Sequence, residues 1–336
     1  MEEDADQIYR ESCWASVGYK MAAKEANSIE KKLLTDSDNL ELRCKLLGYY
    51  FSKQSTTEPV NARRFEHVCW MIRNHPAHHI AGDPYMHFFG SHHSFKQFAE
   101  ARELWIEQTC LHPDSSYVHG NFAQFVIDRD LDYGLELLQH ALKLDETQEQ
   151  WASLIILFCS FKAEPGPLMA HRRKYAELAL TYAQAATNRE SEYLANKISS
   201  FEDLATCALF LNKFELAEEY ANSSAELSKA WRPNDQNTFQ QAVLGTIALR
   251  KNDTQTASNY LLDIKSGDQV EQPMFQLAQE MLACEQHLVV AEFLRRLLKL
   301  KSVDYKLDCW RHWLKQIEKG ESPQIGNFRL KLKTKK

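Results

Sequence analysis

The stretch "FEDLATCALFLNKFELAEEYANSSAELSK", residues 201–229, aligns with a second stretch, "FQQAVLGTIALRKNDTQTASNYLLDIKS", residues 239–266. Apolar residues recur in them at spacings of three and four, as at Leu204, Ala208 and Leu211. This spacing places apolar side chains on one face of an α-helix, whereas a strand would alternate every second residue. The two stretches therefore predict repeated helical units, which are typical of solenoid proteins.

Small residues occupy equivalent positions in the two stretches. Ala205 and Gly245 each follow a leucine on a first helix, and Ala217 and Ala257 stand twelve residues later on a second helix. Two antiparallel helices approach closely only where the side chains at the crossing are small, so each helix needs one small residue there. The turn of each hairpin is expected near an asparagine: Asn212 and Asn252.

The same pattern recurs along much of the chain. Expected second helices carry a small residue at Ala101, Gly134, Ala176, Ala217, Ala257 and Ala291, at intervals of 33 to 42 residues. Three further first-helix positions match them: Gly90, Ala123 and Ala278. We therefore predict an all-α array of about seven antiparallel helix pairs. Its expected divisions are an N-terminal capping helix (1–37), the repeats (38–300), a C-terminal capping helix (301–320) and a basic tail (321–336).

Several segments resemble the tetratricopeptide repeat. "FAEA" at 98–101, with Pro113 twelve residues later, matches that repeat best, and "FELA" at 214–217 and "HALKLD" at 140–145 match well. The resemblance covers residues 38–300 and implies a right-handed α-solenoid whose inner face, lined by first helices, binds extended peptides or a partner's helix. "ELRCKLLGYYF" and "CWRHWLKQIEKGESPQIGNF" are also similar to an uncharacterised bacterial branch, which brings no known activity.

Charge and cysteine content narrow the class of protein. A net charge of −6 disfavours nucleic-acid binding, and the four lysines of residues 331–336 are expected to be solvated. The eight cysteines lie 25 or more residues apart without a CxxC pair, which favours free thiols in a reducing compartment. No apolar run is long enough to span a membrane, and the acidic start shows no signal peptide. We expect a cytoplasmic protein, although a chain whose signal has been removed would look the same.

Histidines gather in "NHPAHHIAGDPYMHFFGSHH", residues 74–93, with His67 just upstream. Zinc needs three or four ligands that converge on one point, and no HExxH motif is present. Neighbouring pairs such as His78-His79 diverge on a helix. We interpret the stretch as a linker between repeats with solvent-facing imidazoles, and we predict no metal ligand and no cofactor. A metal-binding protein or metal-dependent enzyme that uses the His67–His93 cluster is the alternative.

No motif for catalysis is evident. GxSxG, GxGxxG and the phosphate-binding GxxxxGK[ST] are absent, and Cys69 and Cys284 lie in apolar helical stretches where packed thiols are expected. We therefore predict a protein that is not an enzyme and has no catalytic residues.

The residues after the small first-helix positions are expected to face the inner surface of the array. They are polar or capable of hydrogen bonding: Tyr49, Gln124, Thr206, Thr246 and Gln279. Three cations are expected nearby: Lys45, Lys53 and Arg250. This pattern predicts a protein- or peptide-binding scaffold, but polar side chains also occur on any solvated helix. A regulator that responds to a peptide or ligand is a second alternative, and neither the partner nor the oligomeric state is indicated.

Overall fold

The computed structural model describes residues 13–53, 58–88, 92–163, 169–187, 194–231, 237–264, 272–300 and 304–325. These residues are mainly helical and contain no strand, so the predicted all-α class is confirmed. The chain divides into two compact units, residues 1–155 and 156–336, with the boundary inside α8 (Glu149–Ala163). The sequence pattern did not indicate this division.

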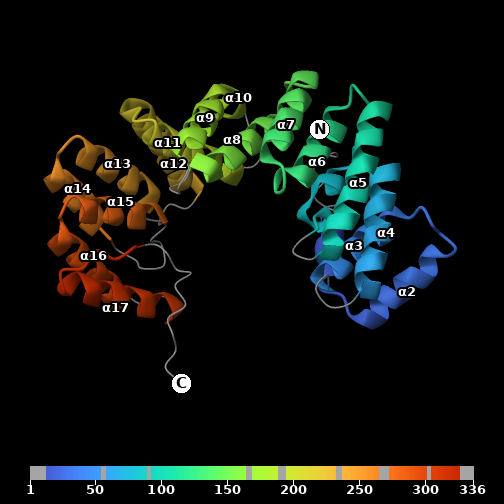
Figure 1. Cartoon of the computed structure of the whole chain (residues 1–336), viewed down its shortest axis with the longest axis horizontal. Helices are drawn as coiled ribbons and strands as arrows, with labels where there is room; N and C mark the ends of the chain where they lie inside the picture. The colour runs from blue at the N-terminus through green and yellow to red at the C-terminus, as the bar shows by residue number, and fades with distance from the viewer. Residues whose placement is uncertain are drawn as a thin grey trace. The chain divides into compact units, whose positions relative to one another are not determined.

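The first unit begins with a short helical stretch, residues 13–19. The elements that follow are α2 (Ala23–Leu33), α3 (Leu40–Lys53), α4 (Glu58–Asn74), α5 (His92–Leu111), α6 (Ser116–Ile127) and α7 (Leu131–Leu144). Two 3₁₀ helices, η1 (His79–Gly82) and η2 (Pro84–Met86), lie between α4 and α5. Each α-helix from α2 to α7 contacts the next along the chain, and η1 and η2 pack on α6 and α3 (Figure 1).

The second unit contains α9 (Met169–Thr181), α10 (Ala183–Thr187), α11 (Leu194–Phe210), α12 (Phe214–Trp231), α13 (Thr238–Arg250), α14 (Thr254–Leu262), α15 (Gln272–Ala283), α16 (His287–Lys299) and α17 (Asp304–Glu318). Helices α11–α12, α13–α14 and α15–α16 form three successive hairpins. The first helices contact one another in the order α11, α13, α15, and α14 contacts α16. Stacking of like helices in consecutive hairpins is the architecture of an α-solenoid.

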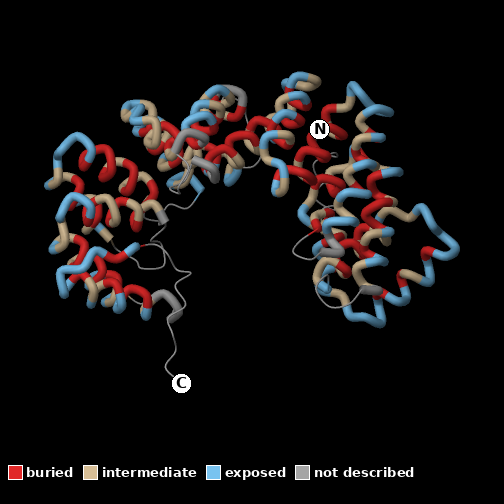
Figure 2. Tube along the Cα trace, viewed as in Figure 1, coloured by how far each residue is buried: buried red, intermediate tan, exposed pale blue. Residues whose placement is uncertain are grey.

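The hairpins cross where the small residues were predicted. Ala205, Ala278, Ala217 and Ala257 have exposed fractions of 0%, and Gly245 is buried. A Cβ added at Gly245 would lie 2.5 Å from Leu277 Cδ2, on the next hairpin, and 3.1 Å from Tyr260 Cβ, on its own second helix. In the second unit, buried faces of neighbouring helices meet and the opposite faces are exposed (Figure 2).

Three successive turns of the second unit share one backbone geometry. Asn212, Asn252 and Glu285 have φ values of 57°, 63° and 62°, in the left-handed region. The N–H of each following residue donates to the carbonyl five residues before it, at 2.9, 2.8 and 2.9 Å, as in a Schellman motif. The turns expected at Asn212 and Asn252 are therefore confirmed, and Glu285 occupies the same position without the residue type that favours it.

The start of the chain differs from the single long leading helix that its periodicity predicts. The first helix stops by Tyr19, and α2 begins afresh after Ala22, whose N–H donates to Glu25 Oε2 at 2.9 Å. A Cβ at Gly48 on α3 would collide with the carbonyl oxygen of Ala15. Close contact with α3 therefore fixes the first helix, and the break lets α2 take a separate path.

The helix pair expected from Gly90 and Ala101 is also different. Ala101 is fully buried on α5, but Gly90 lies outside the described residues. Where a first helix would run, residues 79–86 form η1 and η2 instead. Short turns are favoured over one continuous helix by the side-chain cap of each turn, His78 for η1 and Asp83 for η2, and by Pro84 at the start of η2.

Replacing Gly245 by Val is expected to lower the free energy of unfolding by about 2 kcal/mol, because the branched side chain overfills the crossing with Leu277 and Tyr260. Gly245→Ala is the matched control. Its single methyl meets the mobile end of Leu277, and the gain in helix propensity of about 1 kcal/mol offsets the contact. Urea unfolding measures both. Equal free energies of unfolding for the Val and Ala variants would contradict a close helix crossing at this position.

Replacing Glu285 by Gly is expected to raise the free energy of unfolding by about 1 kcal/mol. Left-handed backbone costs a non-glycine residue about 1–2 kcal/mol, and the lost chain entropy of Gly recovers only part of that. Asn252→Ala, at the equivalent turn, is expected to lower stability instead. The thermal midpoints of the two variants should therefore move in opposite directions; a drop for Glu285→Gly contradicts the assigned turn.

Candidate functional site

The histidine-rich segment is packed into the first unit. The Asn121 side-chain amide on α6 donates to the carbonyl oxygens of Pro76 and His78, both at 2.9 Å. His78 Nδ1 accepts the N–H of Ile80 at 3.3 Å and so caps η1, whose Ile80 and Ala81 are buried. The segment is a linker, as predicted, but its imidazoles at positions 75, 78, 79 and 87 are half-buried rather than solvent-facing. The side chains of residues 92 and 93 lie outside the described residues.

Metal-ligating side chains do not converge in the described part of the chain. No group of three or more His, Cys, Asp or Glu residues is placed there to hold an ion. The cysteines are unpaired, and burial raises the pKa of Cys69 to about 11 and that of Cys159 to about 12. Cys69 is packed as expected, but Cys284 is exposed, because α15 ends beside it and the chain turns there.

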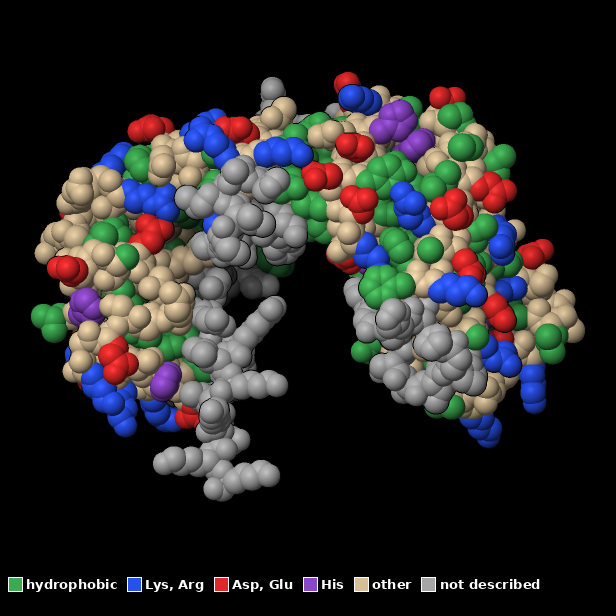
Figure 3. Space-filling view, in the orientation of Figure 1, with side chains coloured by type: hydrophobic (Ala, Val, Ile, Leu, Met, Phe, Trp, Pro, Cys, Tyr) green, Lys and Arg blue, Asp and Glu red, His purple; other side chains and the backbone are tan. Residues whose placement is uncertain are grey.

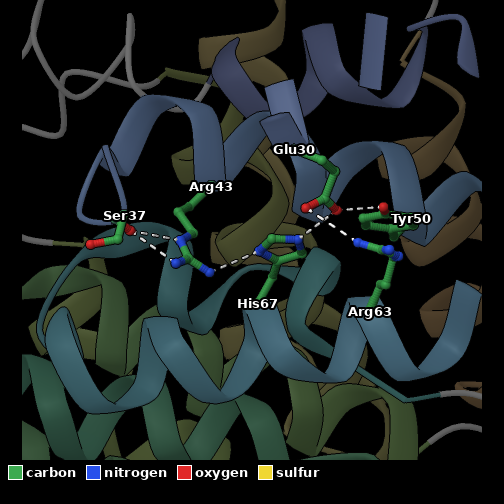
Figure 4. Close-up of polar contacts among 6 residues, drawn as sticks. All are labelled: Glu30, Ser37, Arg43, Tyr50, Arg63 and His67. Carbon is green, nitrogen blue, oxygen red and sulfur yellow. Dashed lines mark hydrogen bonds and ion pairs between the residues drawn. The ribbon is translucent and has the colours of Figure 1, made fainter. Parts of the chain in front are cut away.

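The most extensive buried polar network that involves a histidine is centred on His67 (Figure 4). His67 lies on α4, is 3% exposed, and stacks on Tyr50 of α3 with 5.6 Å between ring centroids. Its Nε2 lies 3.2 Å from Glu30 Oε1 on α2, and its Nδ1 lies 3.2 Å from Arg43 Nη1 on α3. Three helices therefore meet at one imidazole.

Donor and acceptor roles in this network follow from the arginine. A guanidinium only donates, so His67 Nδ1 accepts from Arg43, and Nε2 carries the hydrogen that is donated to Glu30. The Arg43 guanidinium also donates twice to the Ser37 carbonyl oxygen, at 3.1 and 2.9 Å. Tyr50 donates its hydroxyl hydrogen to Glu30 Oε1 at 2.5 Å.

Glu30 is ionised across the neutral range. Burial raises the pKa of its carboxyl, but the hydrogen bonds from His67 and Tyr50 and the positive charge of Arg63 outweigh burial and lower the pKa to about 2. Arg63 Nη1 lies 3.5 Å from Glu30 Oε2. Because both ring nitrogens of His67 are engaged and the ring is buried, the network presents no base to a substrate. It acts as a clamp that holds α2, α3 and α4 together.

A buried arginine links η2 to α4. Arg64 is 2% exposed, and its Nη2 donates to the carbonyl oxygens of Tyr85 at 2.7 Å and His87 at 2.5 Å. Its guanidinium also lies over the rings of Phe51 and Phe88, at 5.5 and 4.9 Å. Burial lowers the pKa of Arg64 to about 9. These partners are backbone and aromatic groups of the same unit, so the contacts are structural, although the buried Nε of Arg64 has no hydrogen-bond partner among the described residues.

Four of the eight predicted surface residues fall in the first unit. Tyr49 is half-buried against the Tyr50 ring, with 5.1 Å between centroids. Gln124 is half-buried with its amide against Gly82 of η1. Lys45 forms an ion pair with Glu41 one turn away, and Lys53 is exposed at the end of α3. Whether these four bind a partner stays a prediction.

The other four fall in the second unit. Thr206 is half-buried and donates to the Glu202 carbonyl at 2.9 Å. Thr246 is only 4% exposed and donates to the Ala242 carbonyl, which differs from the open position expected for it, because the crossing at Gly245 brings the next hairpin over it. Arg250 is engaged by a bidentate pair with Glu280, at 2.7 and 3.0 Å, and by the Leu209 carbonyl at 2.6 Å. It therefore links three successive hairpins.

Gln279 has a different kind of partner, a short segment of the chain that follows α17. Gly320, at φ 80°, ends the helix, and the Glu321 N–H donates to the Gln316 carbonyl at 2.9 Å. The chain then turns back, and the Ile325 N–H donates to Gln279 Oε1 on α15 at 2.7 Å. We call residues 322–325 the C-terminal strap.

The strap is not helical, Ile325 lies in a turn, and its two faces differ. Pro323 and Ile325 are buried, whereas Ser322 and Gln324 are exposed, so alternate residues face the protein. Ile325 belongs to the apolar cluster that includes Phe275, Trp310 and Trp313. Ser322 Oγ lies 3.0 Å from His287 Nε2 of α16. The sequence predicts a basic tail over residues 321–336, but its first residues are packed; the Ser-Pro-Gln-Ile that follows a helix-ending glycine is the sequence signal for this.

The geometry defines a helix-hairpin repeat protein with a non-helical segment bound to one first helix. No protein-family model matches the sequence, and no curated protein matches it. Among solved structures, the crystal structure of Tom70 from yeast is similar, with 15% sequence identity and a TM-score of 0.41 over 88% of this chain. The match covers 58% of the Tom70 chain, so this chain spans less than two thirds of its length.

The described surface carries mixed charge. On the face shown in Figure 3, basic and acidic side chains are interspersed on both units, without a large area of one sign. Among the described helices, none is both long and apolar enough to cross a bilayer.

Replacing Glu30 by Gln is expected to lower the free energy of unfolding by about 2–3 kcal/mol at pH 7. The lowered pKa contributes stability that is present above about pH 4.5 and is lost as pH falls toward 2, so the difference from the parent chain should shrink over that interval. Glu41→Gln, in the exposed pair with Lys45, is the control and should cost less than about 1 kcal/mol. Urea unfolding at pH 7, 5, 4 and 3 measures both; a Glu30→Gln cost that stays constant with pH contradicts the clamp.

Proposed function

We propose that this protein is a non-enzymatic scaffold that binds extended segments of partner proteins on the first helices of its hairpins. One observation carries the proposal. Gln279, whose position in the repeat predicts an inner-surface role, accepts the backbone N–H of Ile325, which belongs to a non-helical segment of the same chain. A side-chain amide that pairs with backbone is the kind of contact by which a surface binds peptide main chain.

The stacked hairpins support a preformed binding surface. The turns at Asn212, Asn252 and Glu285 repeat one geometry, and Arg250 fixes successive hairpins to each other. A surface held in this way loses little conformational freedom on binding, so most of the ordering cost falls on the peptide.

The metal-dependent alternative finds no support in the described residues. His67 is buried and engaged through both nitrogens, and Asn121 and the η1 backbone hold the segment beyond it in place. We propose a cytoplasmic location, which the unpaired cysteines support because free thiols persist in reducing compartments. The similarity to a bacterial branch remains a sequence-based prediction of origin.

Panning a library of random displayed peptides against the full chain tests this function. We expect enriched peptides whose affinity falls about tenfold or more in Thr206→Arg or Gln279→Arg, because a bulky cation on a first helix obstructs the peptide. Two matched controls place the same change on exposed second-helix positions: Thr181→Arg on α9 and Gln255→Arg on α14.

The controls should bind the enriched peptides like the parent chain. Thr181 is well matched to Thr206, since its hydroxyl makes the same bond to the carbonyl four residues before it. Failure to enrich any peptide, or equal binding by the first-helix variants and the controls, contradicts the proposal.

A further inference from the structure

The C-terminal strap occupies a site with its own chemistry. The side chains of Pro323 and Ile325 are buried, and the backbone N–H of Ile325 donates a hydrogen bond to Gln279 Oε1 at 2.7 Å. Resting on the function proposed above, we propose that α15, α16 and α17 form a binding site for an extended Pro-x-Ile segment of a partner protein. The strap fills this site in the free protein, and the partner segment replaces it.

The composition of the strap accounts for its non-helical form. Proline fixes its own φ and disfavours helical geometry in the residue before it, here Ser322. In a partner segment with proline and isoleucine at the same spacing, proline restricts the backbone before binding, so less conformational freedom is lost. Its isoleucine N–H would donate to the Gln279 amide oxygen.

Selectivity follows from the two buried anchors. The apolar cluster that includes Ile325 also contains three large rings, with Phe275 centred 6.3 Å from Trp310 and 6.1 Å from Trp313. An acidic residue at that position would bring an unpaired charge into an apolar cluster. A residue exposed between the anchors, like Gln324, is free to vary.

The contacts that hold the strap among the described residues are ones that a partner segment of the same chemistry can also make. It is attached through the helix-ending turn at Gly320, where an added Cβ would meet no atom within 4 Å. Beyond that turn, the described contacts are the Gln279 bond, the Ser322–His287 contact and the two buried anchors. Tethering gives the strap an effective concentration on the order of millimolar, so a partner must add contacts beside the Pro-x-Ile anchors to displace it.

A fluorescent peptide with the sequence GESPQIGN, that of residues 320–327, tests the site by anisotropy with full-length protein. We expect Ile325→Asp, which releases the strap, to bind this peptide at least about tenfold more tightly than the parent chain does. Adding Gln279→Leu to Ile325→Asp should weaken binding again, and a peptide with aspartate in place of isoleucine should not bind. Thermal unfolding verifies that each variant is folded.

A second measurement needs no variant. Unlabelled GESPQIGN adds no contacts to those of the strap, so it must exceed the strap's effective concentration. At about 10 mM or more it should speed hydrogen exchange of the Ile325 amide in the parent chain, because displacement removes its bond to Gln279. The aspartate-containing peptide is the control and should leave that exchange rate unchanged.

Three results would overturn the proposal. One is a lack of peptide binding to folded Ile325→Asp together with unchanged Ile325 exchange. Another is concentration-dependent dimerisation of the parent chain that Ile325→Asp abolishes without any peptide binding, which assigns the site to the strap of a second copy. The third is capture of library peptides without Pro-x-Ile by both the parent chain and Ile325→Asp with equal affinity. That last result would support the scaffold function but contradict displacement of the strap by a Pro-x-Ile segment.

Discussion

The close crossing of helices at residues without large side chains is the constraint on which the second unit depends. Gly245 has Leu277 of the next hairpin against it on one side and Tyr260 of its own second helix on the other. One missing side chain therefore sets both the angle within a hairpin and the distance to its neighbour. Because helix packing is dense, a branched side chain at this point would overfill the crossing and push Leu277 of the next hairpin away.

Features of the fold that arise from neighbouring residues were predictable from sequence. The hairpins follow from the period-three-and-four pattern and the recurring small residues, and two turns follow from Asn212 and Asn252, since asparagine tolerates left-handed backbone. Glu285 gave no such signal, because glutamate is not favoured in left-handed backbone, and the turn is visible only through its φ value and the bond from the Gln286 N–H to the Met281 carbonyl. The 3₁₀ turns at residues 79–86 were missed because distant residues hold them. Asn121 binds the carbonyls of Pro76 and His78, 45 and 43 residues before it, and Arg64 binds the carbonyl of Tyr85 in η2.

The buried network around His67 shows where sequence reasoning ends. Its partners lie 37 and 24 residues earlier in the chain, on two other helices, and no local spacing links them. A run of histidines suggests a metal site, yet His67, which is buried and hydrogen-bonded through both ring nitrogens, lies outside the run. Its surroundings are an acidic group on one nitrogen and a guanidinium on the other, which leaves no lone pair for an ion or a substrate.

The predicted surface residues differ in which part of the protein their side chains contact. Thr246 and Arg250 were chosen for polarity, but packing of consecutive hairpins engages them, because first-helix positions near a crossing face the next hairpin as well as the inner surface. Gln279 lies where the stack ends against α17, so its amide remains available to an extended chain. An uncovered site of this kind would expose the apolar cluster of Phe275, Trp310 and Trp313, and large exposed apolar areas favour non-specific association. A strap that covers the cluster protects the free protein and raises the affinity that any partner must reach, so the same segment serves stability and selectivity.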